Sequence, residues 1–399
     1  MFRNNDSMIK RIIIPERRDQ AKRANCVLAL LAGLICLVGA EWSSASYQEL
    51  NNSFEDRMLT TGLLPSHLVK DPYPFSGLAS YFNNVDFLIV GGVSAKRLQE
   101  DQSYVLQDDE WLVIVGRFRV LLLQQPGIRL ERTDSSLNAT NFLEFDKRPS
   151  IVVLEKSQLE QFAPELSNIR YHHLWKPLAV LAYAAERSLI FLHQHLLQNW
   201  ILTLIAFSLA IKILLYPITR HTEAAQNKVD AIRLVLDPQL EEIKRSFDGE
   251  TAHNKIMEAH KKLGVSPFFS LRPMLVTLIQ FPILIATFNA LGEMPQFQGV
   301  SFLWIEDLAY PDSLASLPTR LAILGSEISL LPFVMSTLTL ASMLYMSGSV
   351  KKTSVIFMPL LFLILFYPFP AAMVMYWALV NFWQFLLKVL QDFFDPKAL

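Results

Sequence analysis

The feature that most constrains this chain is an uncharged apolar run near its C-terminal end. Residues 355–387 are 33 positions without one acidic or basic side chain. A helix crosses a bilayer with about 20 apolar residues, so this run is too long for one span. Tyr367-Pro368-Phe369-Pro370 interrupts it, and proline breaks an α-helix. The sequence therefore predicts two spans, 354–367 and 371–390, joined by a tight turn.

Further apolar segments of similar length precede this run. Residues 200–219, 267–291 and 328–346 are each predicted to cross the membrane. An earlier segment, 24–40, follows a basic N-terminus at 1–23, and it is either an uncleaved anchor or a signal peptide. The chain is 52% hydrophobic and only 18% charged, which is typical of a membrane protein. The predicted fold class is an all-α polytopic membrane protein with an N-terminal anchor and a five-helix core.

The charges of the connecting segments indicate how the spans are oriented. Residues 220–265 contain eight Lys or Arg residues, whereas the loop 292–327 contains only Arg320. Cytoplasmic loops carry the excess of basic residues, so we expect 1–23, 220–265 and the tail 391–399 on the cytoplasmic side. A helical apolar stripe predicts that 220–265 is a helical hairpin. Its acidic residues are also eight in number, which argues against nucleic-acid binding.

The segment 41–174 differs in character from the spans. It contains short apolar runs of strand length separated by turn residues, for example Phe87–Val90 and Trp111–Val115, and these predict a small β-rich extracytoplasmic domain. His172 and His173 do not indicate a metal site, because adjacent residues share a face on neither a helix nor a strand. Residues 175–197 then have apolar positions at helical spacing, which predicts an amphipathic helix at the membrane interface.

One charge lies inside a predicted span. Lys212 is the only charged residue of 200–219. An ionisable residue in a span costs roughly 2.5–3.5 kcal/mol on insertion scales and is a functional-site hypothesis by default. The alternative is a lysine whose long stem brings its ammonium to the headgroup region. Position alone does not decide between the two.

The order and spacing of several short motifs resemble those of one known family. The likeness covers about residues 174–390. The motifs are Asn199-Trp200, Lys212-Ile-Leu-Leu-Tyr216-Pro217-Ile-Thr219, Leu236-Asp-Pro238, Ile279-Gln280-Phe-Pro282, Phe302-Leu-Trp304-Ile-Glu-Asp307-Leu308, Leu331-Pro332, Phe357-Met-Pro359, Phe369-Pro370 and Tyr376-Trp377 through Asn381. In these residues the chain resembles the YidC type of membrane protein insertases, related to the Oxa and Alb proteins of organelles, as a divergent member.

The resemblance implies a fold and a function. The family fold is an anchor, an extracytoplasmic domain, an interfacial helix and five helices around a hydrophilic groove. Such a protein inserts and helps to fold proteins of the bacterial inner membrane. Its expected partners are nascent membrane proteins and the lipid bilayer, with the ribosome, a targeting receptor and the Sec translocon as further candidates. Both termini are expected in the cytoplasm. No nucleic acid, cofactor or metal is expected, and no enzymatic reaction.

The resemblance also suggests which residues line the groove. The family has an arginine in the first core span, and Lys212 lies at the matching position here, so the charge is retained on a different side chain. Lysine lacks the planar fork with which arginine binds a carboxylate. The candidate groove residues are Lys212, Ser208, Gln280, Thr337, Tyr376, Trp377, Asn381 and Gln384. The hairpin Arg220 to Val265 is the candidate docking segment for partners.

Other interpretations remain for these residues and for the chain. A Ser, Thr, Asn or Gln in a span commonly forms hydrogen bonds between helices, and Tyr or Trp near a helix end commonly belongs to the interfacial belt. An ion- or proton-coupled transporter with Lys212 as its titrating group would predict internal repeats, and the sequence contains none. A membrane assembly scaffold without insertase activity is a third interpretation. The sequence holds no nucleotide-binding glycine loop, metal-spaced His/Cys cluster or nucleophile elbow.

Overall fold

The structure is a computed structural model, and it describes most of the chain after residue 63. The described residues are 48–49, 64, 66–92, 94–132, 137–140, 150–266, 268–269, 278, 280–321, 325–346 and 352–394. The expected anchor 24–40 and much of the first half of the expected span 267–291 lie outside them. Contacts divide the chain into two compact units, which over the described residues are 209–286 on the one hand and 48–208 with 287–394 on the other.

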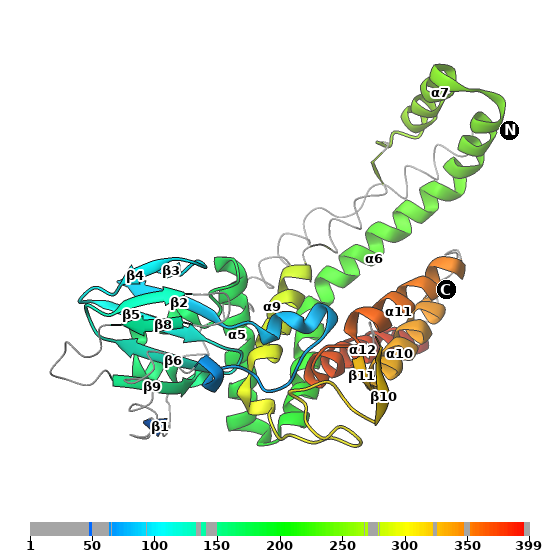
Figure 1. Cartoon of the computed structure of the whole chain (residues 1–399). Coiled ribbons are helices and arrows are strands. Elements are labelled where there is room, and N and C mark those ends of the chain that lie inside the picture. The colour runs from blue at the N-terminus through cyan, green and yellow to red at the C-terminus, as the bar shows by residue number, and fades with distance from the viewer. Residues whose placement is uncertain are drawn as a thin grey trace. The chain divides into compact units, whose positions relative to one another are not determined.

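The N-terminal part of the described chain is built from β-strands, as the sequence predicted (Figure 1). An antiparallel six-stranded sheet has the strand order β1-β9-β6-β5-β2-β3. Its strands are β1 (Gln48–Glu49), β2 (Asp86–Gly91), β3 (Ser94–Arg97), β5 (Glu110–Val115), β6 (Arg119–Gln124) and β9 (Ser150–Glu155). A second sheet, of order β4-β7-β8, contains β4 (Ser103–Val105), β7 (Arg129–Arg132) and β8 (Leu137–Thr140). We call β1 together with residues 64–173 the β domain.

Both faces of the six-stranded sheet are covered, which explains its apolar strands. In β2, Phe87 and Ile89 belong to one hydrophobic cluster, and Leu88 and Val90 belong to another. The first cluster continues into the three-stranded sheet, and the second into the short helices that follow β9. Successive side chains of a strand point to opposite faces. A strand that is buried on both faces therefore reads as a continuous apolar run.

Short helices flank the sheets, and one longer helix follows the β domain. The short ones are η1 (Ser66–Leu68), η2 (Gly77–Asn83), η4 (Lys156–Gln158), α4 (Leu159–Phe162) and η5 (Pro164–Ile169). Then come α5 (Lys176–Leu192) and a single π-helical turn, η6 (His193–Leu197). Residues 176–197 are therefore helical, with a widened last turn. In that turn, the His193 ring stacks on Trp200 with 3.9 Å between the ring centroids.

The next helix is much longer than the predicted span. α6 runs without a break from Trp200 to Ser246, through Pro217 and Pro238. Asn199 caps its start, because the side-chain oxygen accepts from the backbone N–H groups of Ile201 and Leu202 at 2.9 and 3.1 Å. The predicted span 200–219 and the beginning of the predicted hairpin 220–265 therefore lie in one continuous helix. α7 (Gly249–Lys262) and α9 (Gln280–Glu293) follow.

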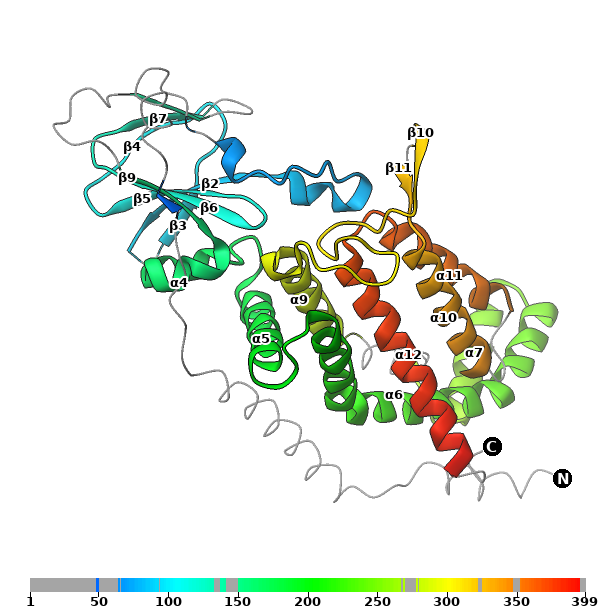
Figure 2. The same ribbon diagram turned by 90° about the horizontal axis from the view of Figure 1, so that it is seen from below.

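The C-terminal part begins with an irregular segment and ends with helices. Its elements are η8 (Pro295–Phe297), β10 (Ala315–Leu321), β11 (Gly325–Ile328), α10 (Leu331–Met346), α11 (Lys352–Phe366) and α12 (Ala371–Phe394). α10 packs against both α11 and α12. The predicted turn after 367 separates α11 from α12. Figure 2 shows the β10–β11 hairpin, which was not predicted, projecting beyond the end of α10.

Asp312 fixes the start of α10. Its Oδ2 accepts from the backbone N–H groups of Leu330 and Leu331 at 2.7 and 2.8 Å. Within the described residues, two helices are long and apolar enough to cross a membrane, at Trp200–Ser246 and Ala371–Leu390. α10 and α11 are apolar but shorter.

Candidate functional site

Lys212 lies in the middle of the apolar part of α6. Its residue exposure is only 8%, whereas the next residue, Ile213, is 60% exposed. A snorkelling lysine extends its ammonium away from the protein along the membrane normal. Lys212 is therefore largely covered by other parts of the chain, whereas its neighbour in sequence is exposed.

Ser208 takes part in a contact between two helices. It is fully buried, and its Oγ accepts from Nε1 of Trp383 on α12 at 3.0 Å. The same hydroxyl donates to the Ile205 carbonyl oxygen of its own helix at 2.7 Å. In the structure, therefore, this candidate groove residue uses its hydroxyl to join α6 and α12.

Tyr376 and Trp377 lie on α12 in an aromatic environment. Tyr376 is 2% exposed and hydrogen-bonds to Thr287. The centroid of its ring lies 6.0 Å from that of Phe288 and 6.1 Å from that of Phe207. Trp377 stacks on Phe366 at 5.6 Å between centroids. Its Nε1 is buried, and none of the described residues accepts a hydrogen bond from it. Neither residue is exposed as an interfacial belt residue would be.

The remaining polar candidates are satisfied locally or lie half-buried. Asn381 Nδ2 donates to the Trp377 carbonyl oxygen at 2.9 Å, and Thr337 Oγ1 donates to the Phe333 carbonyl oxygen at 2.5 Å. Each of these contacts is made within one helix. Gln280 and Gln384 are half-buried. The candidates of α12 and Ser208 lie in one compact unit, and Lys212 and Gln280 lie in the other.

The candidate docking hairpin consists of the end of α6 and all of α7. Between them lies a cleft of about 210 Å³ that is lined by both apolar and charged side chains. The apolar lining residues are Ile243, Phe247 and Ala259, and the charged ones are Glu242, Lys255, Glu258 and Lys262. Lys255 Nζ lies 4.4 Å from the ring centroid of Phe247, and Lys262 Nζ lies 3.0 Å from Glu258 Oε1. The lining thus carries both signs of charge.

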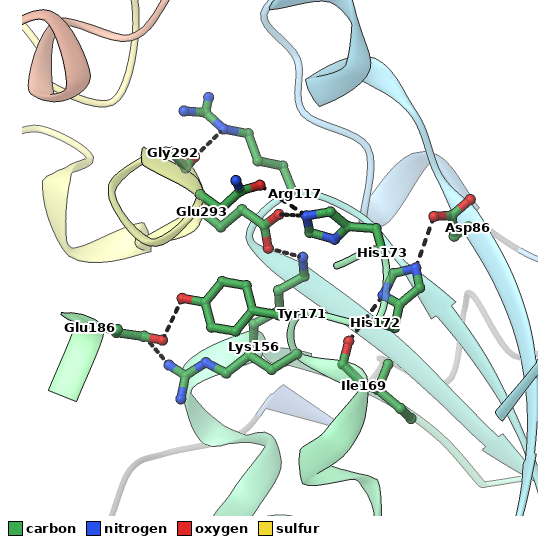
Figure 3. Close-up of polar contacts among 12 residues, drawn as sticks. Asp86, Arg117, Lys156, Ile169, Tyr171, His172, His173, Glu186, Gly292 and Glu293 are labelled. Atoms are coloured by element: carbon green, nitrogen blue, oxygen red, sulfur yellow. Dashed lines mark hydrogen bonds and ion pairs between the residues drawn. The ribbon is translucent and has the colours of Figure 1, made fainter. Parts of the chain in front are cut away.

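Sequence reasoning missed a set of buried charges where the β domain meets α9 and α5 (Figure 3). Arg117, in the turn between β5 and β6, pairs with Asp71 at 2.9 Å, and the two side chains are 1% and 0% exposed. Arg117 also donates to the carbonyl oxygens of Gly292 and Ala309, both at 2.7 Å. Its guanidinium lies 4.4 Å above the ring centroid of Phe82. Burial lowers the pKa of Arg117, and the Asp71 carboxylate opposes that shift.

A second set of contacts binds the C-terminal end of α9. Lys156 Nζ lies 2.7 Å from Glu293 Oε2, with both side chains less than a tenth exposed. His173 Nε2 lies 3.3 Å from Glu293 Oε1 and 3.1 Å from Asn289 Oδ1. His172 points the other way, with Nε2 at 2.9 Å from Asp86 Oδ2. The two adjacent histidines, which lie in a turn, therefore contact different partners.

A third set joins the β domain to α5. Arg170 and Tyr171 both donate to the Glu186 carboxylate, the tyrosine hydroxyl at 2.8 Å. Burial raises the pKa of Glu186, and the Arg170 guanidinium and the Tyr171 hydroxyl act in the opposite direction. Burial also raises the pKa of Tyr171. A charged residue that becomes buried looks the same in a sequence as a charged residue on the surface. The sequence therefore contains no signal by which these residues could have been identified as buried.

The described residues form a largely helical protein with a β-rich N-terminal region, and two of their helices are long and apolar enough to cross a membrane. Residues 191–393, just over half of the chain, match the model of the family described as 60Kd inner membrane protein. The chain belongs to this family, whose curated bacterial relatives are membrane protein insertases of the YidC type.

Individual relatives are similar over about half of the chain. A membrane protein insertase YidC of Chlamydia caviae is 31% identical over 216 residues, which are 50% of this chain and 26% of the relative. The protein of the same name from Herminiimonas arsenicoxydans is 28% identical over 61% of this chain and 41% of the relative. The chain thus spans less than half the length of these relatives. A crystal structure of an active YidC insertase aligns over 82% of both chains at 14% identity and a TM-score of 0.39. The family assignment does not rest on that alignment.

Proposed function

We propose that this protein is an insertase and chaperone of the bacterial inner membrane. It would receive nascent membrane proteins, place their hydrophobic segments in the bilayer and help them to fold. The observation that carries the proposal is the family match over 191–393, which includes the helix that holds the buried Lys212. In this arrangement both termini and the hairpin 220–265 are cytoplasmic, and the β domain and the loop 292–327 are outside.

The proposed mechanism requires no covalent chemistry. A polar tail of the client must cross about 30 Å of hydrocarbon, and a hydrophilic groove among the helices shortens that path. An acidic tail residue 4 Å from the Lys212 ammonium gains about 1 kcal/mol in water and about 4 kcal/mol at an effective dielectric constant of 20. The membrane potential adds about 2.3 kcal/mol per charge per 100 mV for an acidic tail that moves outwards. The hydrophobic segment then enters lipid, driven by burial of its own apolar surface at about 25 cal/mol per Å².

In this proposal the candidate residues have distinct roles. Lys212 attracts the acidic tail. Gln280, Thr337, Tyr376, Trp377, Asn381 and Gln384 contribute polar and aromatic groups to the client path, and Ser208 holds α6 to α12 beside it. The hairpin cleft, which is lined by apolar side chains and by charges of both signs, docks the ribosome, a targeting receptor or the Sec translocon.

The test combines depletion of the protein with substitutions at Lys212. Depletion is expected to impair insertion of small membrane proteins with acidic tails. Lys212→Arg should retain activity, because it preserves the charge, whereas Lys212→Ala and Lys212→Glu should reduce insertion. The matched control is a client whose tail acids are replaced by Asn and Gln, which should respond little to these substitutions. Full activity of Lys212→Glu on acidic tails would refute the electrostatic role, and normal insertion with lost solute flux after depletion would favour a transporter.

A further inference from the structure

The three sets of buried contacts around the β domain suggest a purpose for this domain. We propose that the β domain is a positioning element that holds the C-terminal end of α9, through Arg117, Lys156 and His173, in the arrangement that client insertion requires. The consequence for client insertion rests on the proposed insertase function. The hold of the β domain on the end of α9, which we call the grip, can be measured independently of insertion.

The first step of the argument is the nature of the groups that Arg117 binds. Gly292 lies in the last turn of α9, and the last four carbonyl groups of a helix have no partner within the helix. These groups carry the negative end of the helix dipole, where a cation is favourable. Arg117 donates to the Gly292 carbonyl oxygen and, with another nitrogen, to that of Ala309 in the segment after α9. One arginine therefore ties the helix end to the segment that follows it.

The second step is the close packing at Gly292. A β-carbon at this position would lie 2.6 Å from Cζ of Phe82 in the β domain and 3.4 Å from Sδ of Met373 in α12. A side chain at position 292 would therefore force the Phe82 ring or the helix end to shift. The β domain, the end of α9 and α12 thus meet at one point, directly beside the Arg117 contact.

The third step is the balance of charge. Lys156 and His173 bring cationic or polar groups to Glu293, the last residue of α9. Across the three sets, the cations Arg117, Lys156 and Arg170 face the anions Asp71, Glu293 and Glu186, one to one. Ion pairs buried to this degree contribute little net stability, but removal of one member strongly destabilises the protein because it leaves the other charge buried alone. Their effect is to make one docked geometry far more favourable than its alternatives.

A charge exchange on the full chain in bilayer nanodiscs tests the grip. Lys156→Glu and Glu293→Lys each place like charges together, and the double variant restores opposite charges. We expect the amides of residues 287–310 to exchange hydrogen at least about tenfold faster in each single variant and to return to within about threefold of the wild type in the double variant. Lys96→Glu, an exposed charge reversal on β3, is the matched control and should leave exchange unchanged.

Client insertion is measured on the same samples. Each single variant should insert an acidic-tailed client several-fold more slowly, and the double variant should recover. Unchanged exchange in both single variants overturns the grip, and faster exchange with unchanged insertion overturns its role in insertion. Absence of insertion by the wild type would instead refute the proposed function, whereas the exchange result would still stand.

Arg117→Lys covers the case in which the charge exchange prevents folding. Lysine can still pair with Asp71 but cannot bridge two carbonyl groups with a planar fork. We expect unchanged protection of β5 and β6 together with faster exchange at 287–310. Wild-type protection at 287–310 in this variant overturns the assignment of Arg117.

Discussion

The hydrogen bond between Ser208 and Trp383 allows the role of Ser208 to be decided quantitatively. Ser208 is fully buried, and its Oγ accepts the indole N–H at 3.0 Å. Ser208→Ala removes that acceptor, and Trp383→Phe removes the donor but keeps an aromatic ring. Hydrogen bonds between membrane helices average about 0.6 kcal/mol and reach about 1.7 kcal/mol. We therefore expect a coupling of about 0.6–1.7 kcal/mol, which is about 3-fold to 16-fold in the unfolding equilibrium.

A double-mutant cycle measures this coupling directly. The four proteins are unfolded in mixed micelles, and the free energies of unfolding of the single and double variants are compared. Ser336→Ala is the matched control, because none of the described residues hydrogen-bonds to the buried hydroxyl of Ser336, so it should not couple to Trp383→Phe. A coupling indistinguishable from zero would refute the reasoning. So would loss of client insertion in Ser208→Ala without a similar loss in Trp383→Phe, since that would indicate direct contact with the client.

Three further predictions concern the β domain and its contacts. The pKa of Asp86 is lowered, chiefly by its hydrogen bond to His172. Its stabilising contribution is therefore present above the unfolded pKa of about 3.9 and is lost as the pH falls through the folded pKa. Asp86→Asn should make the stability of the β domain fall less steeply below about pH 4, as followed by tryptophan fluorescence. Gly292→Ala should cost about 1–3 kcal/mol by overpacking against Phe82, with recovery when Phe82→Leu is added, measured by thermal unfolding. Arg170→Met leaves the buried Glu186 carboxylate without its cation, with only the Tyr171 hydroxyl as a partner, and should cost about 3–5 kcal/mol, measured by hydrogen exchange of α5.

The β-rich region could be predicted because its strands have an unambiguous local signal. Strands buried on both faces, such as β2 and β5, read as apolar runs between turn residues, and this pattern needs no knowledge of partners. The hairpin β10–β11 has no such signal: Ala315–Leu321 includes Pro318 and Arg320, and proline is depleted in strands. Its pairing depends on contacts between strands that propensity does not describe.

The candidate site was predictable in part. The unusual position of Lys212 could be recognised because a charge in an apolar run has a high cost. The partner of Ser208 could not, since Trp383 is 175 residues away in sequence and the sequence does not specify which helix faces meet. The same limit applies to Arg117, Lys156 and Arg170. Their burial follows from the docking of separate elements, which is a tertiary property.

The unbroken course of α6 has a mechanical consequence. Its 47 residues extend about 70 Å at 1.5 Å per residue, more than twice the roughly 30 Å of hydrocarbon in a bilayer. A single hydrogen-bonded rod therefore connects the turn at the hairpin tip to the buried lysine, with no loop to absorb a displacement. Pro217 and Pro238 each lack the N–H that would complete the helical ladder, so bending costs least at these two positions. A force applied at the hairpin tip is therefore expected to bend the helix at Pro217, five residues from Lys212.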